Sequence, residues 1–433
     1  MLKLAALFCL LANALGATHP PFKVIFEWNA TEFNWASPEA LDQAIKHKEY
    51  IVENNAIAGI KIWKNKMYLT IPRWRKGVPV TLGVTSATPV NDVTAPKLDP
   101  YPNWDMQTLG DCNAFQFVQS MEIDPLGRMW VLDTGRTETM ELKPEPRCPP
   151  RLVILDLENE GAVLRSYVFP KEVAPPDSAY LNDIVVDHEN GGAAYITDNG
   201  HDDPGIIVFT LKDNKSRKVR HKSMRAEGEA ENFVVAGVNI LSPMHVDGIA
   251  LSPPGGERQV YYSPLSSFHL YAISTSILRN DSLTSIEDSH VQELGRKSSQ
   301  TDGMVMTNQG VLYFGLLADD AIAMWDTNVN PSFASGLRVI SRDHSLTQWP
   351  DTFAIDESGH LWCVTNALQN YMNHRIDINR PNFRVVSSST AAKNYQYNKD
   401  GTIPALPVIT AAADRVNFTL SLCLTILLVF LAR

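Results

Sequence analysis

The amino-acid sequence predicts an all-β fold, a six-bladed β-propeller with a central channel. One observation is a repeated pattern, in which a polar residue opens a short apolar run and a turn and a second, aromatic-rich run follow. Copies recur roughly 50–65 residues apart, close to the period expected of propeller blades. They begin at Ala58, Gln119, Asn182, Asp247, Asp302 and Asp351.

A second observation concerns the first run of each copy, which is apolar on both faces, as in Ile184, Val185 and Val186. Strands of this kind are buried between packed sheets, so these runs are expected to be the innermost strands of the blades. The aromatic residues of the second run are expected to pack between blades. They are Trp130, Tyr195, Tyr261, Tyr313 and Trp362.

The remaining segments are arranged around this ring. Ser37 and Pro38 open a predicted helix that runs through Tyr50, with Ser37 as its cap. One propeller domain is predicted over residues 22–380. From 381 to 410 the sequence is rich in Ser, Asn and Pro and shows no strand pattern, which predicts a tether.

Both ends of the chain carry apolar segments that indicate processing. A basic residue, an apolar run and two small residues predict a secretory signal peptide over residues 1–16. Residues 411–433 are predicted to be a hydrophobic tail, and the small residues at its start resemble a GPI-attachment signal. A short membrane anchor and an uncleaved apolar tail stay open as alternatives. The protein is therefore expected to be secreted or held at the cell surface.

The cysteines and glycosylation sequons are consistent with secretion. A disulfide between Cys112 and Cys148 is expected to tie an inserted loop to the blade beside it. Cys363 lies inside the apolar run LWCV and is expected to be a buried free thiol. Sequons predict glycosylated surface loops at Asn29, Asn214 and Asn280.

Composition and motifs exclude several classes of function. The chain has 433 residues, of which 44% are hydrophobic and 20% charged, as expected of a globular protein with a large core. Its formal net charge of −10 argues against nucleic acid as a partner. The sequence contains no HExxH, GxSxG, Cys-x-x-Cys or phosphate-binding glycine motif, so it predicts no cofactor and no zinc or redox centre.

The polar residues that open the repeats form the candidate ligand site. Asn182, Asp247, Asp302 and Asp351 are expected near the mouth of the channel. One carboxylate about 4 Å from an ammonium group contributes on the order of 4 kcal/mol at an effective dielectric near 20, and aromatic faces add to this attraction. The same ring, with Asp183, would also suit calcium. The structural alternative is that each Asp caps a turn through its own backbone amides.

A histidine among carboxylates, His201 in DNGHDDPG, is a candidate for proton transfer. A histidine in a polar surface turn is the commoner case, because short motifs overpredict function.

Several longer motifs resemble the yellow/major royal jelly protein family, from about Glu27 to Asn379. They include PYPNWDMQTLGDCNAF, GRMWVLDTGR, CPPRLVILDL, HVDGIALSP, LYFGLLADDAIAMWDT and WPDTFAIDESGHLWCVTN. The resemblance implies a secreted six-bladed propeller linked to pigmentation. It also implies dopachrome conversion, as in some relatives, or binding of biogenic amines in the channel, as in salivary relatives.

In those amine binders, polar residues of the last blade contact the amine, which implies this role for Thr352 and Asn366. The sequence departs from the family at Leu126, where relatives often have Cys. It also departs after Asn366, where Ala367 and Leu368 replace a common aromatic residue.

The leading hypothesis is a propeller that binds small cationic catechol- or indole-type ligands in its channel. The alternatives are a dopachrome-converting enzyme, a calcium-dependent propeller hydrolase and a structural extracellular glycoprotein.

Overall fold

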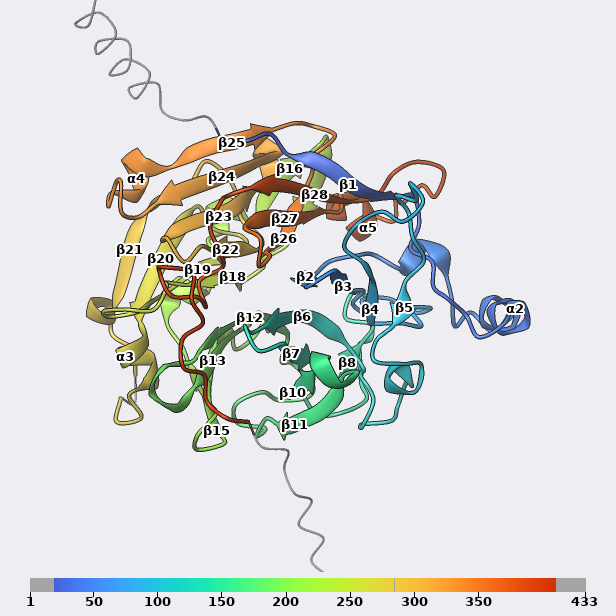
Figure 1. The fold of residues 1–433 in the computed structure, drawn as a ribbon, viewed down its shortest axis with the longest axis horizontal. Helices are drawn as coiled ribbons and strands as arrows, with labels where there is room; N and C mark the ends of the chain where they lie inside the picture. Colours follow the sequence, from blue (N-terminus) through green and yellow to red (C-terminus); the bar gives the residue numbers. More distant parts are fainter. Residues whose placement is uncertain (1–18, 284, 410–433) are drawn as a thin grey trace, which may run out of the picture.

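Each repeat of the sequence folds into one four-stranded antiparallel sheet, and six such sheets surround a central axis (Figure 1). The computed structural model describes residues 19–283 and 285–409, so the predicted signal peptide and hydrophobic tail lie outside it. The first strands of neighbouring blades contact one another around the ring and are therefore the innermost strands. The predicted six-bladed propeller is confirmed.

The first three blades follow the chain in order from the inside outward. Blade 1 comprises β2 (Ile60–Trp63), β3 (Lys66–Thr70), β4 (Leu82–Ser86) and β5 (Asp99–Pro100). Blade 2 comprises β6 (Val118–Ile123), β7 (Arg128–Asp133), β10 (Arg151–Asp156) and β11 (Ala162–Val168). Blade 3 comprises β12 (Leu181–Asp187), β13 (Ala193–Asp198), β14 (Gly205–Thr210) and β15 (Lys215–Val219).

The next two blades repeat this order. Blade 4 comprises β18 (Val246–Leu251), β19 (Gln259–Pro264), β20 (His269–Ser274) and β21 (Val291–Arg296). Blade 5 comprises β22 (Met304–Met306), β23 (Val311–Leu316), β24 (Ala321–Asp326) and β25 (Arg338–Arg342). The second strands of the blades carry the aromatic residues named above, and all five of these side chains are buried.

The last blade joins the two ends of the chain and closes the ring. It comprises β26 (Pro350–Ile355), β27 (His360–Thr365), β28 (Phe383–Ser389) and β1 (Lys23–Trp28). Trp28 pairs with Phe383, and Phe26 and Trp28 are buried against the blade. The predicted tether is therefore wrong at its start, because the Ser-rich segment 383–389 gains a partner strand from the N-terminus.

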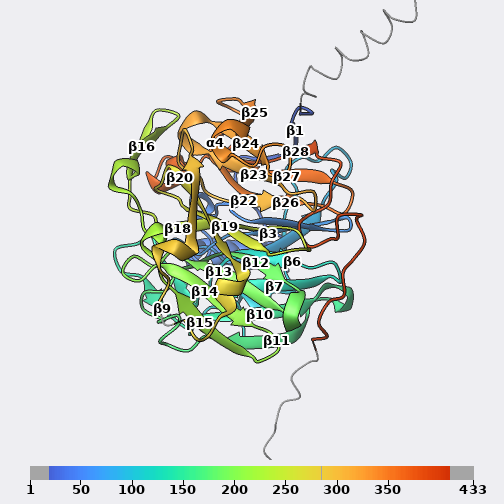
Figure 2. The same cartoon turned by 90° about the vertical axis from the view of Figure 1, so that its left-hand side faces the viewer.

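The segment after β28, here called the C-terminal strap (residues 390–409), also packs against the propeller. Tyr395 N–H donates to Met306 O at 3.0 Å, and Gln396 Nε2 donates to Ile123 O at 2.8 Å. Figure 2 shows this strap on one face of the disc and β16 (Asn232–Val235) on the opposite face. The strap thus connects blades 5 and 2 across one end of the channel.

Two short ribbons, four α-helices and eight short 3-10 helices complete the described fold. β8 (Arg136–Thr137) pairs with β9 (Glu145–Pro146), and β16 pairs with β17 (Val238–Leu241). The α-helices are α2 (Pro38–Lys46), α3 (Thr275–Arg279), α4 (Phe333–Gly336) and α5 (Leu368–Met372). Within the described residues, none of the helices has the length and hydropathy needed to cross a membrane.

The predicted first helix is confirmed at its start and is shorter than expected at its end. The Ser37 side chain accepts from Ala40 N–H at 3.2 Å, and Pro38 occupies the first turn. The helix ends at Lys46 rather than Tyr50, because Lys48 adopts a left-handed backbone conformation with φ of 59°.

The predicted disulfide is present between Cys112 and Cys148, with an S–S distance of 2.00 Å. Cys363 is a buried free cysteine. The three sequon residues Asn29, Asn214 and Asn280 are exposed, and their glycosylation stays a prediction.

Candidate functional site

Four of the predicted ligand-binding residues line one cavity at the mouth of the channel. Asn182, Asp247, Asp302 and Asp351 surround this cavity of about 370 Å³. In blades 3, 4 and 6 the strand pairing shifts just after the innermost strand begins, and the opening residue falls within the irregularity. Such bulges re-aim side chains, here into the channel mouth.

Glycine sets the close spacing of these strands. A Cβ atom on Gly248 would lie 2.1 Å from the carbonyl oxygen of Asp302, and one on Gly303 would lie 2.3 Å from that of Asp351. Gly303 N–H donates to Asp351 O at 2.7 Å. The Asp-Gly pairs of the repeats therefore bring three carboxyl-bearing strand ends together.

Each of the three carboxyls accepts a hydrogen bond from a neutral side chain. Asn199 Nδ2 donates to Asp247 at 2.8 Å, and Trp349 Nε1 donates to Asp302 at 2.7 Å. Asn366 Nδ2 donates to Asp351 at 2.5 Å. Within the described part of the chain, none of the three forms an ion pair.

The one arginine that lines this cavity is engaged elsewhere. Arg136 donates to the backbone carbonyls of Asp177 at 2.9 Å and Ala179 at 3.1 Å. Its two terminal nitrogens thus hold the loop before β12, and within the described residues Arg136 forms no ion pair with the three carboxyls.

Burial without a cationic partner raises the pKa of all three carboxyls. Desolvation raises the pKa of Asp247 to about 7, and repulsion from Asp351 adds to the shift. Desolvation also raises the pKa of Asp302 and Asp351 well above the usual value, with repulsion between neighbouring carboxyls as the next cause. The neighbouring carboxyls of Asp247 and Asp302 also act on each other, since their contact lowers the pKa of Asp247 and raises that of Asp302.

The turn-capping alternative applies to different aspartates. Asp124 and Asp356, which end the first run of their repeats, accept turn amides, from Leu126 at 3.0 Å and Ser358 at 2.8 Å respectively. Each also accepts an indole N–H from the second strand of its blade. The aspartates that open the repeats are thereby left to face the channel.

The rest of the cavity wall is aromatic and apolar. Trp74 Nε1 donates to the Tyr180 hydroxyl at 2.6 Å, and that hydroxyl donates to Gln119 Oε1 at 3.0 Å. Further lining residues are Met140, Met244, Leu265, Trp349, Leu368 and Met372. An apolar pocket with a few convergent polar groups is typical of small-molecule sites. Gln119 opens the second repeat and Leu265 ends the fourth, whereas the other residues lie outside the repeated pattern, and Trp349 lies two residues before the start of the last repeat.

The two residues implied by the family resemblance lie behind the cavity wall. Asn366 is fully buried and bonds Asp351 and the carbonyl of Ile57. The Thr352 hydroxyl donates to Asp351 Oδ1 at 3.0 Å. Both side chains therefore position Asp351 in this structure.

His201 lies at the rim of the cavity, apart from the carboxyls. Its side chain is 80% exposed and bonds Asp202 at 3.0 Å. His245, behind it, accepts from Ala226 N–H and bonds the His201 carbonyl. From this position His201 can contact a ligand at the entrance of the cavity, but it does not bond the three carboxyls.

The far end of the channel is filled. Lys61 Nζ pairs with Glu122 at 3.3 Å, and the Tyr395 hydroxyl of the strap accepts from Val186 N–H at 2.8 Å. Asp183 accepts from Ser120 at 2.9 Å and is not among the lining residues of the mouth cavity. Only about 20 Å³ of open space remains beside Lys61 and Tyr395. The mouth cavity is thus a pocket that a ligand enters from one face.

No group of three or more His, Cys, Asp or Glu side chains in residues 19–283 and 285–409 is arranged to hold a metal ion. Calcium binding stays an untested alternative.

Comparison with known proteins places this structure in a family. Residues 116–396 match the family described as "Major royal jelly protein". "Protein yellow" of Drosophila melanogaster and that of Drosophila erecta are each 30% identical over 382 residues, covering 84% of this chain and 68% of each relative. A solved structure of a luciferin-regenerating enzyme is 13% identical, with a TM-score of 0.49, and the match covers 83% of this chain and 97% of that one. On the family match and the relatives' identity, the chain belongs to the major royal jelly protein family.

Proposed function

We propose that the mouth cavity binds a small organic cation, a biogenic amine that carries a catechol or indole ring. The observation that supports this most is the set of three buried carboxyls without a cationic partner among the described residues. An ammonium group would replace the missing charge, with a Coulomb attraction on the order of 4 kcal/mol per carboxylate at about 4 Å. The ring would pack against the aromatic wall formed by Trp74, Tyr180 and Trp349.

Calorimetric titration with dopamine and serotonin tests this proposal. The protein is expected to bind both amines, and Asp302→Asn is expected to weaken binding by about tenfold or more, because it removes a carboxyl that would ionise beside the bound ammonium group. Asp213→Asn is the matched control, since Asp213 is exposed at the turn between β14 and β15. The absence of heat at millimolar amine, or equal loss in both variants, would reject the proposal. The same titration repeated with added calcium and with EDTA tests the alternative that the cavity binds calcium.

A second candidate is conversion of dopachrome, which the resemblance to the family also implies. It is favoured by Asp247, a buried carboxyl beside Asp302 whose pKa, raised to about 7 by desolvation, allows it to release and take up a proton near neutral pH. The rearrangement moves two protons from the five-membered ring carbons to the two quinone oxygens, so the indole ring forms as the quinone becomes a catechol and no oxidant is needed. The decay of dopachrome absorbance, compared with heat-denatured protein, tests this activity, and equal rates would exclude it.

Members of this family are generally secreted, and the Cys112–Cys148 disulfide fits an oxidising compartment. We propose an extracellular protein linked to pigmentation, with GPI attachment through residues 411–433. Release from cells by a phosphatidylinositol-specific phospholipase would support the attachment. Retention on the membrane, or free secretion of the full-length chain, would contradict it.

A further inference from the structure

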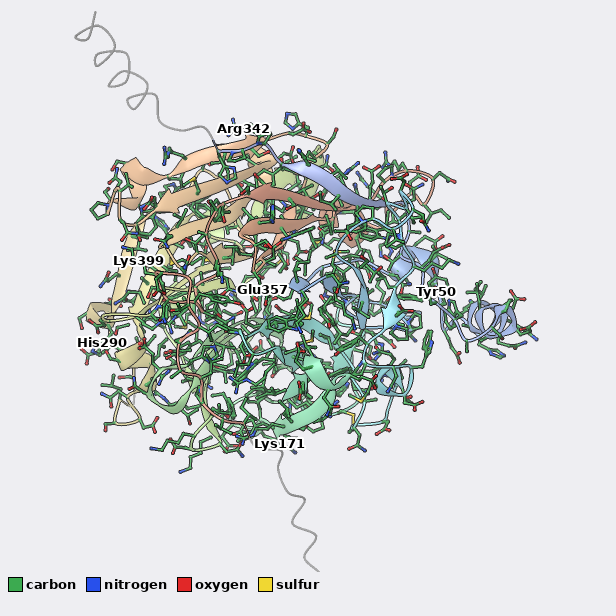
Figure 3. The ribbon with its side chains drawn as sticks, viewed as in Figure 1. Tyr50, Lys171, His290, Arg342, Glu357 and Lys399 are labelled. Atoms are coloured by element: carbon green, nitrogen blue, oxygen red, sulfur yellow. A yellow bond between two sulfur atoms is a disulfide. The ribbon has the colours of Figure 1, made fainter. Side chains whose placement is uncertain are left out.

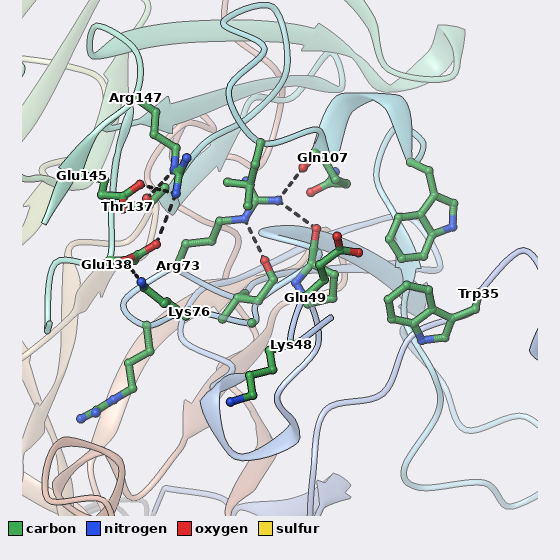
Figure 4. A pocket seen from close by; sticks show the side chains of 16 residues that line it. Trp35, Lys48, Glu49, Arg73, Lys76, Gln107, Thr137, Glu138, Glu145 and Arg147 are labelled. Carbon is green, nitrogen blue, oxygen red and sulfur yellow. Dashed lines mark hydrogen bonds and ion pairs between the residues drawn. The ribbon is translucent and has the colours of Figure 1, made fainter. Parts of the chain in front are cut away.

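A second and larger cavity lies beside the channel mouth and shares no lining residue with it. Its volume is about 550 Å³, and Figure 4 shows Trp35 on one side and Glu138 with Arg147 on the other. The segments 73–76 and 136–140 form the common wall. Trp74 and Met140 face the channel cavity, whereas Arg73 and Glu138 face this outer cavity.

The walls of the outer cavity are held firmly by Arg73. This guanidinium is buried and donates to five backbone carbonyls from three segments of the wall. The acceptors are Val78 at 2.9 Å, Pro79 at 2.8 Å, Gln107 at 2.6 Å, Phe115 at 2.7 Å and Gln116 at 2.9 Å. The Cys112–Cys148 disulfide ties the segment that contains Gln107 and Phe115 to the one that carries Glu145 and Arg147. The cavity is therefore preformed, which lowers the entropic cost of filling it.

The charge of the outer cavity is opposite to that of the channel mouth. Three acidic residues line it, Glu49, Glu138 and Glu145, against five basic residues. The basic residues are Lys48, Arg73, Arg75, Lys76 and Arg147. This excess of positive charge occurs in a chain with a net charge of −10. An anionic ligand is therefore favoured here over a cationic one.

Two lysines at the rim retain the freedom to bind an anion. Lys48 has no carboxylate within ion-pair distance in the described part of the chain. Lys76 pairs with Glu138 only loosely, at 3.6 Å, and its side chain is 65% exposed. Arg147 is already committed to Glu138 and Glu145, and Arg75 bonds His374. The left-handed conformation of Lys48 places this residue at the cavity edge after helix α2.

An aromatic surface forms the other side of the cavity. The rings of Trp35 and Trp104 lie with their centroids 4.8 Å apart and their planes inclined by 31°. Both indoles are only partly buried, and Leu109 beside them is 49% exposed. A planar ring can cover this surface and gain both apolar burial and aromatic contact.

We propose that the outer cavity is a second ligand site that binds small planar aromatic acids. The ring of the acid packs on Trp35, and its carboxylate lies between Lys48 and Lys76. This site is independent of the amine proposed for the channel, because the two cavities have no residue in common.

Two probes with the same ring and opposite charge separate the sites. Calorimetric titration with indole-3-acetate is expected to show binding that weakens as salt is added, because the contact is electrostatic in part. Lys48→Gln is expected to weaken it about threefold, and Trp35→Ala about tenfold, whereas Trp35→Phe retains most of the affinity. Tryptamine binding is expected to be unchanged in all three variants.

Two controls make the result decisive. Lys171→Gln removes the same charge at an exposed position, far from Tyr50 and therefore from Trp35, which packs against Tyr50 (Figure 3). Asp302→Asn affects only the channel and is expected to leave indole-3-acetate binding intact. The proposal is overturned if indole-3-acetate does not bind at millimolar concentration. It is also overturned if Lys48→Gln behaves like Lys171→Gln, or if Asp302→Asn abolishes binding of the acid. Failure of tryptamine alone would count only against the channel proposal.

Discussion

Asp247 shows how burial converts an ordinary carboxyl into a group that titrates near neutral pH. It is 4% exposed, accepts a hydrogen bond from Asn199, and its pKa is raised to about 7, chiefly by desolvation. A cluster of three such carboxyls costs stability whenever it is ionised, because each charge is desolvated and repels its neighbours. Binding of a cation in the cavity would offset this repulsion between the carboxylates and so recover the lost stability.

This arrangement predicts that the ligand-free protein loses stability as pH rises from about 4 through 7. In the unfolded chain Asp247 titrates near its ordinary value of 3.8, whereas its pKa in the folded protein is about 7. Between these values the folded state holds a proton that the unfolded state has lost, so the free energy of unfolding falls with rising pH. Urea unfolding of wild type and Asp247→Asn at pH 5 and pH 7.5 measures the effect. The variant is expected to lose a smaller amount of stability over this interval, and parallel pH profiles would contradict the assignment.

At the level of strands, the Asp-Gly pairs connect the repeat to the site. Gly248 lies on β18 against the Asp302 carbonyl, and this close approach brings the acidic strand ends together. Each Asp-Gly pair therefore determines both how closely the innermost strands pack and where the carboxyl lies in the cavity.

Gly248→Ala is expected to lower the free energy of unfolding by about 2–4 kcal/mol, because the added methyl group would overlap a backbone oxygen. It is also expected to weaken amine binding, since β18 must move away from Asp302. Thermal unfolding and calorimetry measure the two effects. Gly228→Ala is the control, because a Cβ atom there meets no atom within 4 Å. Equal melting temperatures for both variants would show that the strands can separate at little cost.

The repeats predicted the blades and four residues of the site, because alternation of polar openings and apolar runs is a local property of the chain. The sequence did not predict strand β28, because its Ser-rich segment becomes a strand only when β1 pairs with it. Trp74 and Tyr180 escaped for a related reason, because they reach the cavity from loops outside the repeats. The resemblance to the family implied ligand contact for Thr352 and Asn366, and the structure adds that both side chains bond Asp351, a contact that the sequence does not reveal.

On the scale of the whole molecule, the C-terminal strap makes the channel a pocket with one entrance. Tyr395 is buried among the innermost strands, where its hydroxyl accepts from Val186 N–H and donates to Glu122 at 3.4 Å. Figure 2 shows that this closure lies on the face opposite to β16. The acidic mouth is thus the side from which solutes reach the carboxyls.

Tyr395→Phe is expected to destabilise the protein by about 1–3 kcal/mol, because Val186 N–H loses its buried acceptor. Tyr397→Phe is the matched control on the same strap, since no hydrogen bond of its hydroxyl occurs within the described residues. Urea unfolding of the two variants provides the comparison. The strap would not be a stabilising closure if both variants unfolded at the same urea concentration.

The pairing of β1 with β28 also sets the order of events during biosynthesis. Trp28 emerges from the ribosome about 355 residues before its partner Phe383. At translation rates of about 5–20 residues per second, the first strand waits about 20–70 s for the blade it completes. Phe26 and Trp28 lack the strand that covers one side of them throughout that time, so the nascent chain is expected to favour chaperone binding at its N-terminus until synthesis is almost finished.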